Sequence, residues 1–489
     1  MKGNTIKVVV GLLVMLLLAL PLVGTGCPAP PEEFTLEITV VGEGTTSPSP
    51  GTSSITEGES ITVTATPNPG YEFLRWEGDV SGTTSSVTFE MTSDKSVVAL
   101  FEQTVLVGYL GAFAGPTATA SDRLWTCAKE FFTWANETDY LPGVKVEWTE
   151  EDTRYDIAQV PIVYRKMMAR CEPMVLFTMT AVGSTGVKPL ADEDRIPVLS
   201  FTGSVATAQE PVGYVFQETF VPEINFNCFL NYVADTWDVE EEGRPCVVAS
   251  LSWEDPDGTQ HIASGIETAA ELGIDFKEEY AEVGPVGTMD FSTYVTRLKE
   301  LDPDYIFFPM IGPATGSALK TMDAMGMDTK KAVYIVMSAG GMYEELTAVA
   351  GEELTYGATL VMADYAYSDP LITEDQEHLR SLMEPTKFGW DARYHVNALS
   401  FYTSCKILYE GLRIAIEDVG IENLDREALY NALQTIENFD PGVSLPVTFG
   451  TDDRLSNQSC YIYEIGTDGV PHLKTDKIYN WPQKWPGVY

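Results

Sequence analysis

The sequence predicts an α/β protein with two lobes, each built on a parallel, doubly wound sheet, preceded by a small all-β domain. From residue 104 onwards, short apolar strand patterns alternate with helical patterns, and this rhythm restarts after a break near Pro222. Before residue 104, apolar and polar residues alternate between Gly-, Pro- and Ser-rich turns, which is typical of half-buried strands. A chain of 489 residues is long enough for roughly three domains.

The first 26 residues have the pattern of a secretory signal peptide. Lys2 and Lys7 supply a positive start, and residues 8–20 form an apolar run that is short for a membrane span. Small residues then lead into Cys27 and resemble the lipobox of bacterial lipoproteins, although Gly24 stands where that motif usually has Leu. The resemblance implies export, cleavage before Cys27, and a lipid anchor at Cys27 on the outer face of the cytoplasmic membrane or in the periplasm. An ordinary signal peptide or an uncleaved anchor would also export the chain.

A Pro-rich tether at residues 27–33 leads into a β module at residues 34–103. Strict alternation predicts three of its strands, at residues 34–40, 60–66 and 86–91. The stretch PNPGYEFLRWEGD at residues 67–79 resembles the divergent internalin B-repeat, present here in one copy. That resemblance implies a spacer or a contact surface. We expect Trp76 to be the core aromatic of this module rather than a carbohydrate-stacking residue.

Strands and helices alternate through the rest of the chain. The predicted strands are residues 105–110, 144–148, 174–177, 197–200, 245–251, 305–308 and 333–337. The predicted helices are around 127–132, at 157–170, 262–272 and 291–301, from 317 onwards, and at 394–416 and 426–436. This order divides the chain into lobe one (104–222), lobe two (223–345), a return to lobe one (346–440) and a C-terminal segment that completes the lobes (441–489). Ligands of open α/β sheets bind beyond the carboxyl ends of the strands, so the loops after the strands are the candidate site.

These loops carry motifs that resemble the leucine/isoleucine/valine-binding, or branched-chain amino-acid binding, protein family. The motifs occur in order: GAFAGP at 111–116, TAVGSTG at 180–186, IPVLS at 196–200, TMDFS at 288–292 and AGE at 350–352. The resemblance extends from about Thr104 to the C-terminus. It implies the type I periplasmic-binding-protein fold, a small-molecule ligand in a cleft between the lobes, an ABC permease as partner in the membrane, and no cofactor.

The resemblance also implies which residues line the cleft. Lobe one would contribute Phe113, Thr180, Ala181, Ser184, Thr202, Gly203 and Ser204, and lobe two Trp253, Asp257, Ile311, Gly312 and Gly340. Hydroxyl groups and backbone N–H groups at helix N-termini can replace the hydrogen bonds that a polar solute loses when it leaves water. The same Thr and Ser positions are equally typical of helix caps. Trp253 and Phe113 are equally typical of core aromatics.

Three positions depart from the pattern of the family's amino-acid binders. Gly340 stands where a lobe-two acid holds the ligand's ammonium group, Asp257 replaces an aromatic residue before Gly258, and the loop at 310–312 lacks the expected Tyr. A bare ammonium group would then need Asp257 or Glu254 as its partner. We therefore expect a small organic solute of the amino-acid, amide or aromatic-acid type, and not a simple leucine-like ligand.

Composition excludes some classes of function and leaves others open. The net charge of −42 repels nucleic-acid phosphates, so we expect no nucleic-acid partner. The four His residues are scattered without HExxH spacing, and residues 183–186 (GSTG) do not form a nucleophile elbow, so we predict no enzyme. We expect a monomer. A ligand-sensing receptor subunit and a surface adhesion protein remain alternatives.

Seven Cys residues occur, and six remain if Cys27 is lipidated. An even number in an exported chain permits up to three disulfides, whereas wide spacing in large domains is equally typical of buried thiols. Both interpretations stay open from the sequence. No pair has C-x-x-C spacing, so we expect no metal or redox motif.

Overall fold

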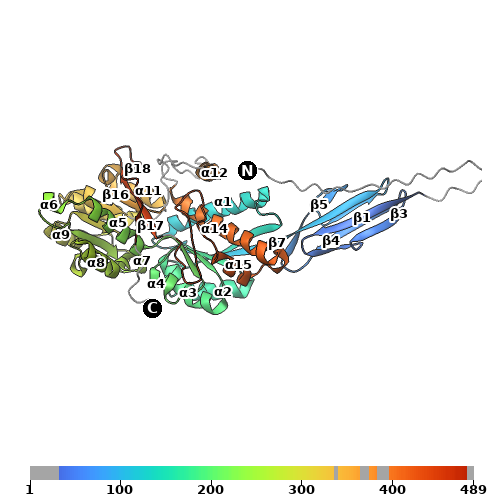
Figure 1. Ribbon diagram of the computed structural model, residues 1–489, viewed down its shortest axis with the longest axis horizontal. Coiled ribbons are helices and arrows are strands. Elements are labelled where there is room, and N and C mark those ends of the chain that lie inside the picture. Colours follow the sequence, from blue (N-terminus) through green and yellow to red (C-terminus); the bar gives the residue numbers. More distant parts are fainter. Residues whose placement is uncertain (1–31, 335–339, 364–373, 383–395, 457, 482–489) are drawn as a thin grey trace, which may run out of the picture.

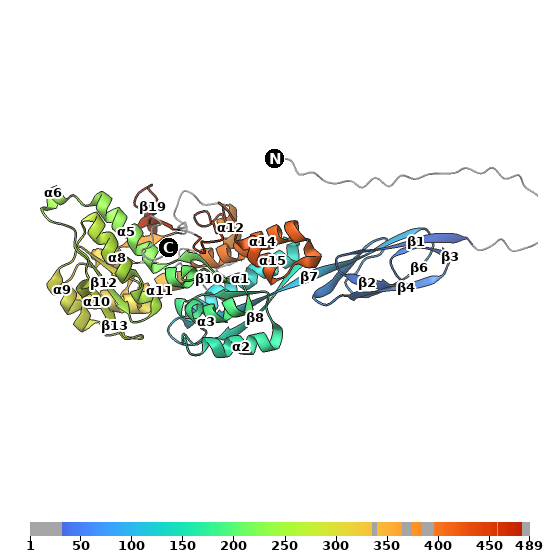
Figure 2. The same ribbon diagram turned by 60° about the horizontal axis from the view of Figure 1, so that its bottom comes forward.

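Two α/β lobes lie next to each other, and the β module extends from the end of lobe one that points away from lobe two (Figures 1 and 2). The computed structural model describes residues 32–334, 340–363, 374–382, 396–456 and 458–481. The predicted fold class, two parallel-sheet lobes preceded by an all-β unit, is confirmed.

Lobe one is built on five parallel strands in the order β8-β7-β9-β10-β11. Their bounds are β7 Lys95–Gly111, β8 Val144–Asp152, β9 Val175–Thr178, β10 Val198–Thr202 and β11 Val215–Phe220. The helices are α1 Ala118–Thr138, α2 Val160–Cys171, α3 Ala181–Asp194, α4 Val205–Gln209, α12 Glu374–Leu382, α14 Val396–Val419 and α15 Arg426–Leu433. Aromatic packing fills the core, where the rings of Tyr109 and Trp125 stack with centroids 4.4 Å apart.

Lobe two is built on the order β13-β12-β14-β15-β16-β17-β18, with β12 to β16 parallel and β17 antiparallel. The strands are β12 Val248–Trp253, β13 Ala281–Gly284, β14 Tyr305–Phe308, β15 Ala332–Tyr334, β16 Thr359–Met362, β17 Ser459–Ile465, β18 Pro471–Leu473 and β19 Tyr479–Asn480. The helices are α5 Pro222–Thr236, α6 Val239–Glu242, α7 Pro256–Thr259, α8 His261–Leu272, α9 Ser292–Leu301, α10 Gly312–Ala324 and α11 Gly340–Ala350.

The chain returns to lobe one later than residue 346, where the sequence placed the boundary. Strand β16 still belongs to lobe two, since Val333 of β15 pairs with Thr359. This buried strand is only four residues long and was not predicted from the sequence, so the segment was placed in lobe one. The C-terminal part divides in the same way: Leu455 pairs with Gln217 of lobe one, and β17 then enters the sheet of lobe two.

The β module is a small sandwich that shares a strand with lobe one. Its strands are β1 Glu33–Val41, β2 Gly44–Ser47, β3 Gly51–Thr56, β4 Ser60–Pro67, β5 Tyr71–Gly78 and β6 Ser86–Glu90. One sheet has the order β2-β4-β6, and the other has β3-β1-β7-β5. Trp76 is 1% exposed and donates from its indole N–H to the carbonyl of Thr84 at 2.9 Å. Trp76 is therefore a core residue of the module.

The module is fixed to lobe one by a continuous strand and by side-chain contacts. Strand β7 pairs with β1 and β5 in its first half and with β8 and β9 in its second half. The Tyr71 hydroxyl donates to the carbonyl of Ile421 at 3.1 Å, and the Gln103 side-chain amide donates to the carbonyl of Leu424 at 2.9 Å. No flexible linker separates the module from lobe one within this strand, so we expect the two to move together.

All six Cys residues in the described segments are free thiols, and all but Cys171 are buried, so the structure favours the thiol interpretation over disulfides.

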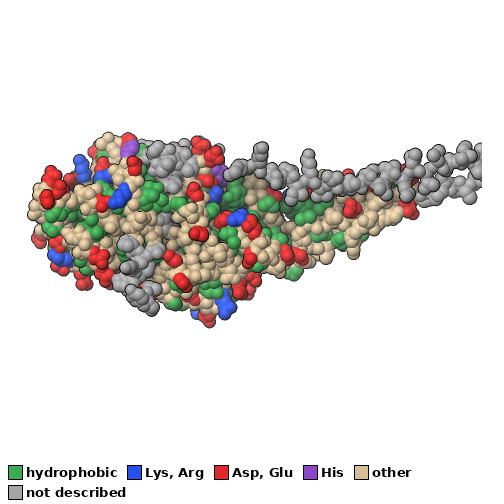
Figure 3. All heavy atoms as spheres, in the orientation of Figure 1, with side chains coloured by type: hydrophobic (Ala, Val, Ile, Leu, Met, Phe, Trp, Pro, Cys, Tyr) green, Lys and Arg blue, Asp and Glu red, His purple; other side chains and the backbone are tan. Residues whose placement is uncertain are grey.

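Acidic side chains are spread over the visible face of both lobes, with basic side chains scattered singly among them (Figure 3). This distribution agrees with the excess of 72 acidic over 30 basic residues.

Candidate functional site

The carboxyl-terminal end of the lobe-one sheet presents two helix N-termini. Thr180 caps α3 by accepting a hydrogen bond from the backbone N–H of Gly183 at 2.9 Å. Ser204 caps α4 by accepting from the backbone N–H of Thr207 at 2.9 Å. Both hydroxyl groups are buried. The capping function expected of these residues is present, and it places the first N–H groups of both helices at the edge of the lobe.

The remaining lobe-one candidates surround these caps. The Ser184 hydroxyl lies 3.2 Å from the carbonyl of Thr202 and donates to it. Gly203 packs so closely that a Cβ atom there would lie 2.2 Å from Oε1 of Gln217. Phe113 follows the tip of β7 and is half-buried against the Tyr109 ring, with centroids 5.6 Å apart. All the lobe-one candidates therefore lie at one edge of the sheet, beyond the carboxyl ends of its strands.

In lobe two, β12 ends at Trp253 and α7 begins three residues later. Asp255 caps α7 by accepting from the backbone N–H of Gly258 at 2.7 Å. Trp253 is 2% exposed, and its indole N–H donates to the carbonyl of Thr288 at 3.0 Å. The ring of Trp253 is thus buried and its N–H group is bonded within lobe two, as expected of a core aromatic.

Lobe two meets lobe one through Asp257. The Thr202 hydroxyl donates to Oδ1 of Asp257 at 2.9 Å, and a hydrogen bond from the backbone N–H of Ala181 lowers the pKa of the same carboxyl group. Ala181 is the first residue of α3. The lobe-two carboxylate therefore lies at a lobe-one helix N-terminus, the position that suits an anion best.

Tyr155 adds a second link between the lobes. Its hydroxyl donates to Oδ2 of Asp255 at 2.8 Å and lies 3.4 Å from Oδ2 of Asp257. Tyr155 and Arg154 both have left-handed backbone conformations, with φ of 56° and 57°. Such conformations cost roughly 1 kcal/mol or more each in non-Gly residues, so surrounding contacts must hold the loop. The donation from Arg154 N–H to Asp152 at 2.9 Å is one of these contacts.

Glu223 brings a third carboxyl group to the junction of the lobes. It lies in the first turn of α5, is 7% exposed, and accepts from the backbone N–H of Val205 at 3.3 Å. Burial, with a smaller contribution from the negative charge of Asp257, raises the pKa of Glu223 to about 8. Burial and the neighbouring Asp255 raise the pKa of Asp257 to about 7, and burial raises the pKa of Asp255.

Several buried polar atoms at the strand tips lack hydrogen-bond partners within the described segments. They include Oγ1 of Thr117, Oγ1 of Thr178, Oε2 of Glu223 and Oγ of Ser252. A buried polar group without a partner costs about 1–3 kcal/mol. Unsatisfied groups at the ends of β9 and β12 and at the start of α1 and α5 are expected where a polar solute or water supplies the missing partner.

The structure leaves other predicted positions at the margin of this junction. Ile311 and Gly312 are buried at the tip of β14, where α10 begins. Gly340 is the first residue of α11, and the preceding residues 335–339 lie outside the described segments. Cys27 also lies outside them.

Sequence reasoning did not select Tyr155, Asp255 or Glu223. Each had a usable signal: Tyr155 follows the tip of β8, Asp255 precedes a Pro at a helix start, and Glu223 follows a Pro at a helix start. The rule that ligands gather beyond strand tips covers the first two. It also covers Glu223, which follows the tip of β11 at Phe220, although the contact of Glu223 with α4 could not be read from the sequence.

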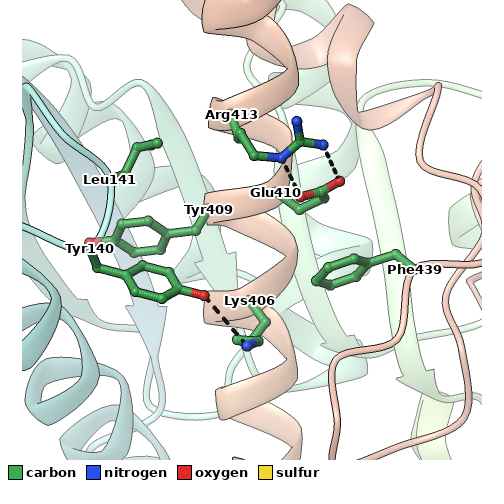
Figure 4. Close-up of a pocket in the computed structure, with 7 residues that line it drawn as sticks. All are labelled: Tyr140, Leu141, Lys406, Tyr409, Glu410, Arg413 and Phe439. Atoms are coloured by element: carbon green, nitrogen blue, oxygen red, sulfur yellow. Dashed lines mark hydrogen bonds and ion pairs between the residues drawn. The ribbon is translucent and has the colours of Figure 1, made fainter. Parts of the chain in front are cut away.

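A separate pocket of about 260 Å³ lies on the other end of lobe one (Figure 4). Tyr140 and Leu141 come between α1 and β8, at the amino ends of the parallel strands and therefore opposite the tips. In Figure 4 the Tyr140 and Tyr409 rings lie beside each other, and Lys406 bonds the Tyr140 hydroxyl at 3.4 Å. Lys406 also pairs with Asp375, and Arg413 pairs with Glu410, so both cations of this pocket are neutralised.

Among the described residues, no group of three or more His, Cys, Asp or Glu side chains is placed to hold a metal ion. Nor does that part of the chain contain a helix with the length and apolarity required to span a bilayer.

The chain thus has two parallel-sheet lobes whose strand tips meet across a junction. The chain belongs to the periplasmic binding protein family, whose model matches residues 104–470. The model of the divergent InlB B-repeat domain matches residues 34–105, which confirms the predicted nature of the β module. A search of curated proteins finds no match.

Solved structures share the fold at low sequence identity. A branched-chain amino acid ABC transporter protein from Thermus thermophilus with bound valine is 20% identical, with a TM-score of 0.66, and the match covers 78% of this chain and 97% of that one. A fatty acid ABC transporter substrate-binding protein from Thermomonospora curvata is 15% identical (TM-score 0.65; 77% and 92% covered). A leucine binding protein from Thermotoga maritima is 16% identical (TM-score 0.61; 77% and 99% covered). These similarities establish the fold.

Proposed function

We propose that this protein is an exported solute-binding lipoprotein of an ABC importer, which captures a small organic solute of the amino-acid, amide or aromatic-acid type between its lobes. The observation that carries the proposal is the meeting of the two sets of strand tips, where Thr202 and Ala181 of lobe one contact Asp257 of lobe two. Membership of the periplasmic binding protein family supports it. So do structural neighbours named as a branched-chain amino acid ABC transporter with bound valine and as a fatty acid ABC transporter substrate-binding protein.

Binding in this scheme is lobe closure over the solute. Hydroxyl groups and helix N-termini at the tips replace the solute's lost contacts with water, and closure excludes solvent. Closure requires that the solute bind the closed form better than the open form. The crossover from β11 to α5, which joins the two lobes, would act as part of the hinge. The closed form would then dock on a permease.

A library screen tests the proposal. We expect the melting temperature of the mature protein to rise with one class of small solute, because a ligand that binds the native state stabilises it by mass action. At a concentration 100 times the Kd, the stabilisation is about 2.7 kcal/mol. The panel contains amino acids, amides, aromatic acids, amines and polyols, read by differential scanning fluorimetry and checked by calorimetry. The absence of any shift across the whole panel would refute a solute-binding function.

The lipid anchor is tested separately at Cys27. We expect wild-type protein to fractionate with membranes and Cys27→Ala protein to appear in the soluble exported fraction, because the substitution removes the thiol that would carry the lipid. Replacement of Cys171, the half-buried thiol, by Ala serves as the matched control and should leave the protein in membranes. Equal membrane association of the Cys27→Ala protein would contradict lipidation and favour an uncleaved N-terminal anchor.

The β module is proposed as a spacer between the anchor and the lobes. It precedes lobe one directly and shares β7 with it, so it would hold lobe one away from the tether in a fixed orientation relative to the module. Its contacts through Tyr71 and Gln103 involve residues 421–424, which lie outside the strand-tip site. The module is therefore not expected to contribute to solute affinity.

A further inference from the structure

The junction of the lobes contains three carboxyl groups, and no cation of the described residues pairs with them. Asp255, Asp257 and Glu223 come from α7 and α5 of lobe two and meet α3 and α4 of lobe one. Within the described part of the chain, no Lys, Arg or His forms an ion pair or a hydrogen bond with any of the three. Buried carboxylates are normally paired, because an isolated charge loses its hydration without compensation.

The groups of lobe one that could bind an anion already have one of these acids as their hydrogen-bond partner. The Thr202 hydroxyl and the Ala181 N–H, which would hold a solute's carboxylate, both bond to Asp257. The carboxylate of Asp257 therefore takes the place that an anionic solute would need. A solute with its own free carboxylate would have to displace Asp257 and would meet the repulsion of the other two acids.

One carboxyl oxygen still lacks a partner. Oε1 of Glu223 accepts from Val205 N–H, whereas the buried Oε2 of the same group has no hydrogen-bond partner in the described segments. Glu223 lies close enough to Asp257 for the two charges to interact. The unmet requirement at this junction is thus a hydrogen-bond donor, ideally one with a positive charge.

We propose that the inter-lobe site selects a solute with an ammonium or amidinium group and no free carboxylate, which the carboxyl groups of Asp255, Asp257 and Glu223 receive. The inference rests on the proposed function but sets aside its amino-acid and aromatic-acid classes, because both carry a free carboxylate; within the proposed amide class, an amide that also carries an ammonium group meets both conditions. Asp257 acts as a specificity-determining residue, since its carboxylate both excludes anionic solutes from the α3 N-terminus and attracts cationic ones.

Isosteric probes test the charge preference directly. The first set is n-butylamine, n-butanol and butyrate; the second is benzamidine, benzamide and benzoate; all are measured at pH 8 with EDTA by fluorimetric melting and calorimetry. We expect the cationic member of a set to bind at least tenfold more tightly than its neutral and anionic counterparts. Tighter binding of butyrate or benzoate would overturn the inference. So would a screen that finds a solute without a cationic group, and that result would leave the proposed function intact.

Variants at Asp257 provide the second readout. Asp257→Asn should weaken binding of the cationic probe by roughly 10- to 100-fold, since a charged partner is lost. Asp257→Ala should in addition improve binding of the carboxylate probe, because it frees Thr202 and Ala181. Asp418→Asn, a change of equal charge at an exposed residue of α14, is the matched control and should behave as wild type. Unchanged affinities in both Asp257 variants would refute the role of Asp257.

Discussion

Substitution of Gly258 by Ala is expected to abolish tight solute binding while leaving both lobes folded. An added Cβ atom would lie 2.1 Å from the backbone carbonyl oxygen of Trp253 and 2.9 Å from Oδ1 of Asp255. Neither the end of β12 nor the cap of α7 can yield without a backbone shift. The shift would break the bond from Gly258 N–H to Asp255 and would move Asp257 away from Thr202.

The expected loss follows from the contacts that move together. Each hydrogen bond to a charged group contributes roughly 1.5–3 kcal/mol, so losing one or two should weaken binding by on the order of 100-fold. The overpacking itself should cost about 1–3 kcal/mol of folding stability. Calorimetry with the solute found by the library screen gives the affinity, and small-angle X-ray scattering shows whether the ligand-free lobes open.

Gly450→Ala is the matched control for this substitution. A Cβ atom at Gly450 would meet only Asp453, at 3.9 Å, which is ordinary van der Waals contact. Affinity and scattering should therefore equal those of the wild type. A Gly258→Ala protein with unchanged affinity and unchanged dimensions would mean that the α7 turn does not position the lobe contact.

The features of this protein that could be predicted from the sequence are those that a local pattern of residues determines. Alternation identified the β module, and apolar strands separated by helical stretches identified both sheets, because burial imposes a period on each element independently of its neighbours. The same logic placed Thr180 and Ser204 at helix starts, where their hydroxyls now cap α3 and α4. These features depend on interactions between residues close in sequence.

The features that were missed depend on tertiary geometry. Strand β16 is only four residues long, and its membership of lobe two is fixed by pairing with β15 and β17 rather than by its own pattern. Glu223 reads from the sequence as an ordinary acidic residue in the first turn of a helix, and only the approach of α4 buries it. Asp257 was selected as a candidate, but its position at the N-terminus of α3 depends on closure of the lobes.

The buried acids should also make the stability of the ligand-free protein fall as the pH rises from about 5 to 8. The pKa is raised to about 7 for Asp257 and to about 8 for Glu223, and it is also raised for Asp255. In this window the native state therefore holds protons that the unfolded state has released. Because stability decreases with pH wherever the native state binds more protons, unfolding becomes easier up to about pH 8 and then levels off.

The expected change in stability with pH is large because the buried carboxyl groups lie together at one junction. A shift of one pKa unit corresponds to about 1.4 kcal/mol, so the strongly shifted acids together should contribute several kcal/mol. Among the described residues, the titratable groups that face these acids are the acids themselves and Tyr155, whose hydroxyl donates to Asp255. None of these carries a positive charge that would reverse the sign.

A double variant isolates this contribution from the general effect of the net charge. Asp257→Asn combined with Glu223→Gln should melt at a higher temperature than the wild type at pH 8 and at nearly the same temperature at pH 5, since neutral amides cannot ionise when buried. The Asp418→Asn protein should keep the wild-type dependence, because Asp418 is exposed. The melting temperature of each protein is measured at half-unit pH steps. If it changes with pH in the same way in the double variant and the wild type, these carboxyl groups are not desolvated in the native state. A cationic solute should flatten the wild-type curve in the same way, because it stabilises the ionised acids that burial otherwise disfavours.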